Sequence, residues 1–138
     1  MGAIYPYEAY TWYKLAKEIG FIDLDHHNEW QRQGHFENYS QIDSIGYSMA
    51  IWTKFVKFGF QRVSDMACRF VRSGALTLEQ AQQYIKDSDY ICDPASKRDF
   101  CRVIGITEEY FDSIVDKHAN LDLVVKDVNG VWRRKDLL

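Results

Sequence analysis

The middle of the chain decides the fold, and it reads Lys54-Phe55-Val56-Lys57-Phe58-Gly59-Phe60-Gln61-Arg62-Val63-Ser64-Asp65. Basic and aromatic residues alternate around one glycine, Gly59. Glycine adopts the left-handed conformation that ends many helices, because it has no Cβ. We therefore expect one helix to end at Gly59 and another to begin just after it.

Caps and glycines set the limits of these two helices. The first is predicted to begin near Asp43, a good N-cap residue, and the second to run from about Gln61 to Ser73 and stop at Gly74. Apolar residues recur at helical spacing in both. They are Ile45, Met49, Trp52 and Val56 in the first, and Val63, Met66, Ala67, Phe70 and Val71 in the second.

The same signals predict four more helices. One covers about residues 7–19, with Pro6 in its first turn and Gly20 at its end. Another begins at Thr77, where Gln80 completes a capping-box pattern. A short helix covers about residues 97–104, and a last one follows Thr107. The predicted apolar faces are Trp12, Leu15, Ala16 and Ile19 in the first of these and Phe111, Ile114, Val115 and His118 in the last.

The remaining segments are a long loop and a tail. Residues 21–41 lack a sustained period and are predicted to form a long ordered loop. Residues 123–132, with Asn129-Gly130 at the turn, are predicted to form a β-hairpin. The expected fold class is mainly α, with about six helices in one compact bundle-like domain and a short carboxy-terminal hairpin.

Composition excludes several classes of protein. The chain has 138 residues, 46% of them hydrophobic and 15% aromatic, which excludes a disordered chain. Its net charge of −3 argues against a nucleic-acid binder. The helix breaks at Gly59 and Gly74 resemble those of a helix-turn-helix, but the acidic charge makes a DNA-binding domain of this kind a poor interpretation. The sequence contains no signal peptide and no apolar run of about 18 residues. We therefore expect a cytoplasmic protein that does not enter a membrane.

The pattern of the three cysteines is also consistent with the reducing environment of the cytoplasm. Cys68, Cys92 and Cys101 form no CxxC pair and no even framework. They are expected to be reduced, partly buried thiols.

The basic residues of the central stretch are the candidate binding site. Arg62, Asp65, Arg69 and Arg72 follow at helical spacing and form one stripe. The full candidate set for an anion is Lys54, Lys57, Arg62, Arg69 and Arg72. These cations suit a phosphorylated or acidic-sugar ligand. The alternative is a solvated basic face held by Asp65.

Other chemistry is weakly indicated. The histidines His26, His27 and His35 meet no metal-ligand spacing, and His118 is expected to be a satisfied core histidine. One acidic set is interpreted as the solvated face of a helix: Glu108, Glu109, Asp112 and Asp116. A second acidic set lies in a loop that lacks the pattern of a calcium site: Asp87, Asp89 and Asp93. No nucleophile elbow and no phosphate-binding glycine loop occurs in the sequence. We therefore predict no catalytic residue, no metal and no cofactor within this chain.

Several blocks resemble a known family. They are Glu37-Asn38-Tyr39-Ser40-Gln41-Ile42-Asp43, Lys-Phe-Val-Lys-Phe-Gly-Phe-Gln-Arg at 54–62, Arg72-Ser73-Gly74-Ala75-Leu76-Thr77 with the following Leu-Glu-Gln-Ala at 78–81, Gly105-Ile106-Thr107 through Phe111, and Asn129-Gly130-Val131-Trp132. In this order they resemble the carboxy-terminal region of the N-acetyl sugar amidotransferases, the WbpG-like and PseA-like enzymes of lipopolysaccharide and flagellar-glycan biosynthesis. The resemblance extends from about residue 4 to residue 132, and the 54–62 block is its most specific part.

The resemblance implies an activity that this chain would share with other parts. Such enzymes convert a sugar acetamido group to an acetamidino group, using ATP and ammonia from a separate glutaminase. ATP is expected in an amino-terminal domain with a Ser-Gly-Gly-x-Asp-Ser loop, which this sequence lacks. The implied partners are a nucleotide-linked N-acetylated sugar and the glutaminase.

The resemblance also gives roles to single residues. The basic residues would contact phosphates or a carboxylate, and Asp65 would orient Arg62 or Arg69. Tyr39 and Phe60 would pack on the sugar or base, beside Gly59. The family usually has glycine where Gln61 stands, so a side chain there is expected to limit the approach of a ligand to the backbone.

Two other functions remain open. The chain could be a docking module for the catalytic domain, for a glutaminase or for a second copy of itself. The aromatic loop with Trp30 and Phe36 fits such docking. An unrelated all-α regulatory domain is the third hypothesis.

Overall fold

The structure, a computed structural model, describes residue 4 and residues 8–26 and 32–138. Within these residues it confirms a mainly α fold with six α-helices and one two-stranded antiparallel hairpin. The helices are α1 Ala9–Glu18, α2 Ile45–Phe58, α3 Arg62–Arg72, α4 Leu78–Ser88, α5 Pro94–Ile104 and α6 Glu108–His118. The strands are β1 Val124–Lys126 and β2 Trp132–Arg134, and short 3-10 turns cover Leu24–His26 and Lys135–Leu137.

The helix ends follow the predicted caps closely. Gly59 ends α2 with φ +76°, in the left-handed region. The N-cap of α2 is Ser44 rather than Asp43, one residue further along. Thr77 and Gln80 form the capping box of α4. The prediction for α5 started too late, because Asp93 caps that helix and Pro94 occupies its first turn.

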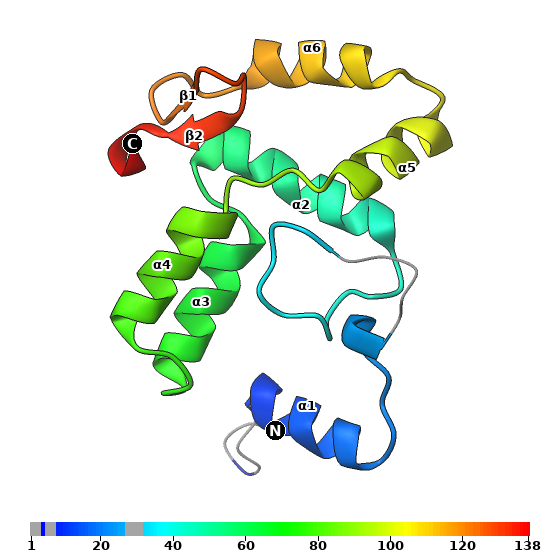
Figure 1. Cartoon of the computed structure of the whole chain (residues 1–138), viewed down its shortest axis with the longest axis vertical. Coiled ribbons are helices and arrows are strands. Elements are labelled where there is room, and N and C mark those ends of the chain that lie inside the picture. Colours follow the sequence, from blue (N-terminus) through cyan, green and yellow to red (C-terminus); the bar gives the residue numbers. More distant parts are fainter. Residues whose placement is uncertain (1–3, 5–7, 27–31) are drawn as a thin grey trace.

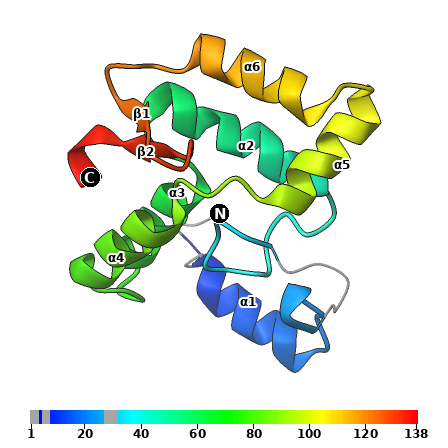
Figure 2. The same ribbon diagram turned by 45° about the horizontal axis from the view of Figure 1, so that its top comes forward.

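Helix α2 lies at the centre of the fold (Figure 1). Helices α5 and α6 pack against it, and the hairpin covers its carboxy-terminal end, as Figures 1 and 2 show. Helices α3 and α4 form a second pair beside this layer. The main core contains the residues Met49, Trp52, Phe55, Val56, Cys101, Phe111, Val115, Val124 and Trp132.

Helix α1 lies at the edge of the molecule in both views (Figures 1 and 2). None of its described residues is buried. On its predicted apolar face, Leu15 is 46% exposed and Ile19 is 82% exposed. The opposite face holds the helix in place, because Tyr10 packs on Phe70 and Tyr13 stacks on Tyr39. Pro6 and Tyr7, which the prediction also used, lie outside the described residues.

Two smaller predictions have different outcomes. His118 was expected in the core, but it is exposed on α6, so that prediction is wrong. All three cysteines carry free thiols; Cys101 is buried and Cys92 is half-buried, but Cys68 is exposed, so the prediction of partly buried thiols is wrong for Cys68.

Candidate ligand-binding site

The basic residues of the central stretch divide into three groups. Lys54 and Asp65 form an ion pair across the turn from α2 to α3, with 2.9 Å between Nζ and Oδ2. The same ammonium lies 4.9 Å from the centre of the Phe60 ring. The Lys54 and Asp65 side chains are 35% and 40% exposed. Asp65 thus pairs with the lysine of α2, whereas the sequence suggested an arginine of its own helix.

Arg62 points into the protein. Its Nε donates to the Glu37 carboxylate at 3.4 Å, and its Nη2 donates to the Ser40 hydroxyl. A second arginine, Arg32, donates to the same carboxylate at 3.3 Å and to the Glu37 carbonyl oxygen at 2.6 Å. The Arg32 and Glu37 side chains are only 1% and 2% exposed. This buried cluster joins the loop of residues 32–40 to the start of α3.

The buried cluster also acts on a histidine. Burial and the positive charges of Arg32 and Arg62 lower the pKa of His35 to about 3. His35 Nδ1 is buried and has no hydrogen-bond partner in the described part of the chain. His35 is therefore neutral at physiological pH and would resist protonation.

The third group consists of exposed cations. Lys57 on α2 and Arg69 and Arg72 on α3 are all exposed. Among the residues that the structure describes, none of their side chains makes a hydrogen bond or an ion pair. These three cations remain available to an anion from outside, whereas Lys54 and Arg62 already have partners.

Gln61 does not occupy a ligand-facing position. It is only 1% exposed, and its side-chain amide donates to the Ile91 carbonyl oxygen. Its backbone N–H donates to the carboxylate of Asp89, which also accepts hydrogen bonds from Ser64. Burial raises the pKa of Asp89, while the hydrogen bonds from Ser64 and Gln61 oppose that rise. Asp89 therefore caps α3 from the end of α4, and the side chain at position 61 belongs to the core.

Tyr39 lies at a different place from Phe60. Tyr39 lines a cavity of about 270 Å³ between α1, the 32–40 loop, α3 and α4. Phe60 lines a separate cavity with Gly59 and Arg134. The two aromatic residues that the resemblance placed together therefore face different spaces.

Aromatic rings make most of the wall around Tyr39. The six rings are those of Tyr10, Tyr13, Phe36, Tyr39, Phe70 and Tyr84, and we call the space between them the aromatic cavity. Phe36 stacks on Tyr84 with 4.7 Å between ring centres, so it does not stand exposed as the docking hypothesis expected. Trp30, the other residue of that hypothesis, lies outside the described residues.

A cavity of about 430 Å³ lies among α5, α6 and the hairpin. The acidic residues Glu108, Asp112 and Asp116 of α6 line it, and Lys97 bridges to Asp112 at 2.7 Å. Sequence patterns suggested a solvated helix face for these residues. Their spacing of four does place them on one side of α6, but it gave no sign that Lys97 lies opposite.

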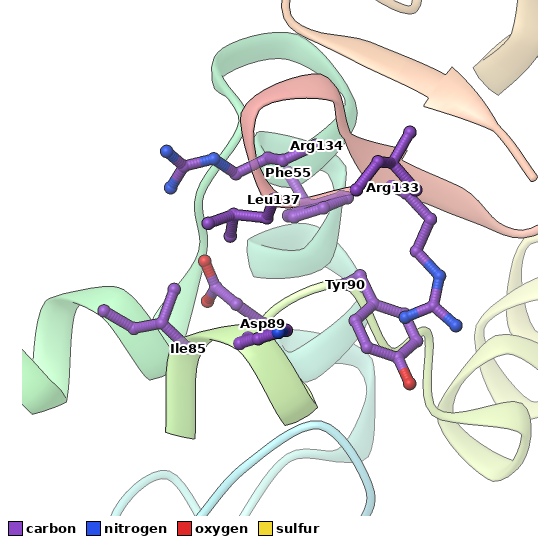
Figure 3. Close-up of a pocket in the computed structure, with 9 residues that line it drawn as sticks. Phe55, Ile85, Asp89, Tyr90, Arg133, Arg134 and Leu137 are labelled. Carbon is purple, nitrogen blue, oxygen red and sulfur yellow. The ribbon is translucent and has the colours of Figure 1, made fainter. Parts of the chain in front are cut away.

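A small cavity of about 120 Å³ separates the end of α4 from β2 (Figure 3). Arg133 and Arg134 are neighbours on β2 and extend in opposite directions. The Arg133 guanidinium lies 3.3 Å from the centre of the Tyr90 ring and pairs with Asp127, and Arg134 pairs with Asp136. Both arginines have acidic partners, so this cavity is a weak candidate for an anion.

Metal ligands do not converge in the described residues. No group of three histidine, cysteine, aspartate or glutamate side chains there has the geometry to hold a metal ion. His27 lies outside the described residues. His26 bonds to Asp23, and His35 lies beside Arg32 and Arg62.

The chain is thus a mainly helical domain. It contains one buried ion cluster, around Glu37, and a separate set of exposed cations on α2 and α3. Residues 33–136 match the family model described as "LPS biosynthesis protein WbpG-like, C-terminal domain". The chain therefore belongs to this family of lipopolysaccharide biosynthesis proteins, as its sequence blocks suggested. No curated protein matches the chain. In the described residues, no helix is both long enough and apolar enough to cross a membrane.

Proposed function

We propose that this chain is the carboxy-terminal part of an ATP-dependent N-acetyl sugar amidotransferase of cytoplasmic lipopolysaccharide or surface-glycan biosynthesis. The reaction would convert an acetamido group of a nucleotide-linked sugar to an acetamidino group. The amide oxygen would attack the α-phosphorus of ATP and release pyrophosphate. Ammonia would then attack the amide carbon, and AMP would leave carrying the former amide oxygen. ATP would bind a separate amino-terminal domain, and a glutaminase would supply the ammonia.

The role of this chain would be to position the substrate. The observation that carries this proposal is the exposed, unpaired state of Lys57, Arg69 and Arg72 in the described part of the chain. A nucleotide-linked sugar carries phosphates, and arginine binds phosphate through two parallel N–H groups. The family membership favours such a substrate over other anions.

A titration of this chain with UDP-linked N-acetylated sugars, followed by two-dimensional NMR, tests the proposal. Arg69→Ala combined with Arg72→Ala should weaken binding by about a hundredfold, because each of the two contacts to a charged group contributes about 1.5 kcal/mol. Arg98→Ala combined with Lys117→Ala removes the same charge from α5 and α6 and serves as the control. ATP serves as the comparison ligand. Equal affinities in the two double variants would contradict the proposed site.

One observation favours a second function, docking. Leu15 and Ile19 are exposed on the face of α1 that points away from Tyr10 and Tyr13. An apolar stripe of this kind is typical of a surface that another protein covers. The candidates would be the catalytic domain, the glutaminase or a second copy of the chain. If this function alone holds, the titration shows no shifts near α3, and Leu15→Lys with Ile19→Lys changes self-association or partner binding.

A further inference from the structure

The aromatic cavity has the composition of a site for a flat ring. Two stacked pairs form its sides, Tyr13 on Tyr39 at 4.1 Å and Phe36 on Tyr84 at 4.7 Å between ring centres. Phe70 meets Phe36 edge to face, with 78° between the ring planes. Such π surfaces attract planar heteroaromatic groups, and nucleic-acid bases stack on aromatic side chains in many proteins.

Charge does not by itself select the ligand of the aromatic cavity. The Glu37 carboxylate, which lines the cavity, is already paired with Arg32 and Arg62, whereas Asp25 accepts from the neutral Asn38 amide at 2.6 Å. The choice of a planar group rests instead on the stacked side chains, whose π faces suit a base.

A polar group in the wall has no partner. The hydroxyl of Tyr39 is buried and makes no hydrogen bond within the described part of the chain. Burial, with the negative charge of Glu37 as the next cause, raises the pKa of Tyr39 to about 12, so the hydroxyl keeps its proton. Buried hydroxyls are normally hydrogen-bonded, and one without a partner requires an explanation. The hydroxyl is not accessible to solvent, so a carbonyl or ring nitrogen of a nucleobase would bond to it only after the Tyr39 side chain turns toward the cavity.

A cation lies beside the aromatic cavity. The ammonium of Lys14 on α1 is 4.5 Å from the centre of the Tyr10 ring, and Tyr10 lines the cavity. Lys14 is exposed, so it can meet a negatively charged group that extends from the cavity into solvent. A base inside with phosphate outside is the arrangement that a nucleotide would need.

We propose that the aromatic cavity binds the nucleobase of the nucleotide-linked sugar, with the base stacked among the rings and Lys14 next to the phosphates. This inference rests on the proposed function for the identity of the whole ligand. The affinity for a base can nevertheless be measured without it, because a nucleoside carries neither the phosphates nor the modified sugar.

Titration of this chain with uridine, cytidine and adenosine, followed by two-dimensional NMR, tests the inference. At least one nucleoside should shift the signals of residues 10–13, 36–39 and 84. Tyr84→Leu should weaken the binding of that nucleoside about tenfold, since stacking of a base on one aromatic ring contributes about a factor of ten in affinity. Tyr84 is 40% exposed, so the fold should tolerate the change. Tyr110→Leu on α6 removes a tyrosine that is 56% exposed and serves as the matched control.

Tyr39→Phe separates the hydroxyl from the ring. It keeps the stack on Tyr13, and it should weaken nucleoside binding several-fold if the hydroxyl bonds to the base. The inference is overturned if no nucleoside shifts these signals, or if Tyr84→Leu and Tyr110→Leu bind equally well.

The proposed function and this inference can fail separately. Nucleoside binding without a response of UDP-sugars to the Arg69 and Arg72 changes would support the aromatic cavity and contradict the anion site. UDP-sugar binding that depends on those arginines but not on Tyr84 would support the anion site and contradict the aromatic cavity as a base site.

Discussion

The two ends of α3 use the same kind of residue in different ways. At the first end, Arg62 is enclosed by the 32–40 loop and bound to Glu37 and Ser40. At the other end, Arg69 and Arg72 stand in solvent without a partner in the described part of the chain. All three belong to one helical stripe, so helical position alone does not separate a structural arginine from an available one.

The difference arises from the segments that pack on each end. The buried end meets a loop that supplies a carboxylate and a hydroxyl, and Asp89 of the neighbouring helix caps its backbone. At the open end, the chain leaves α3 through a turn at Ser73 and Gly74, and Arg69 and Arg72 are exposed. We expect changes at the first end to act on stability, and changes at the second end to act on ligand binding.

A pair of glycines should give the largest contrast. Gly34 has φ +71°, and a Cβ on it would lie 2.5 Å from the Ile91 carbonyl oxygen, which is backbone. Gly34→Ala should lower the free energy of unfolding by about 3 kcal/mol, from strain and clash together. Gly74 has φ +75° but no atom within 4 Å of such a Cβ, so Gly74→Ala should cost only about 1 kcal/mol. Urea unfolding measures both, and equal midpoints would show that the loop does not pack closely on Ile91.

The arginines themselves should differ next. Arg62→Ala removes one of two cations from the buried Glu37 carboxylate and should cost about 2 kcal/mol, below the full cost of breaking a buried pair because Arg32 remains. Arg69→Ala should change stability by less than about 0.5 kcal/mol, as expected for a surface residue. The same unfolding experiment checks both. A cost at Arg69 as large as that at Arg62 would remove the distinction between the two ends.

Arg62→Lys provides a sharper version of this experiment. Lysine keeps the positive charge, but its single ammonium lacks the rigid planar fork with which the arginine bonds to Glu37 and Ser40 at the same time. If geometry as well as charge holds the loop, this variant should recover only part of the lost stability.

The sequence predicted the helices well because their signals are local. Caps and glycines at Gly59, Thr77 and Gly105 act within a few residues, and the structure places helix ends there. The Asp93-Pro94 signal was also present, but the prediction began that helix later. The turn signal at Asn129-Gly130 is equally local, and the structure confirms the predicted hairpin.

The candidate site was predictable in composition but not in geometry. The basic block identified the cations, yet the partner of Arg62 lies 25 positions away in the sequence, at Glu37. Charged residues inside a loop without a period gave no sign that they are buried. For α1, apolar spacing predicts one face of a helix, but it does not say whether the chain itself covers that face. The six rings of the aromatic cavity come from four segments, and the sequence assigned only Tyr39 among them to ligand binding. It assigned Phe36 to docking and Phe70 to the core.

The smallest expected effect is a dependence of stability on pH at the buried end. His35 has a pKa of about 3 in the folded protein, whereas an unfolded histidine has its ordinary pKa near 6.5. Between these values the unfolded chain binds more protons than the folded one, so stability falls as pH decreases below about 6.5. The loss between pH 6.5 and 5.5 should be about 1 kcal/mol. Urea unfolding across this range measures it, and His35→Gln should flatten the curve, while the same change at the exposed His118 should leave the slope in place. If His35→Gln keeps the full slope, the proton is taken up elsewhere, and burial together with the charges of Arg32 and Arg62 does not lower the pKa of His35 as the buried cluster implies.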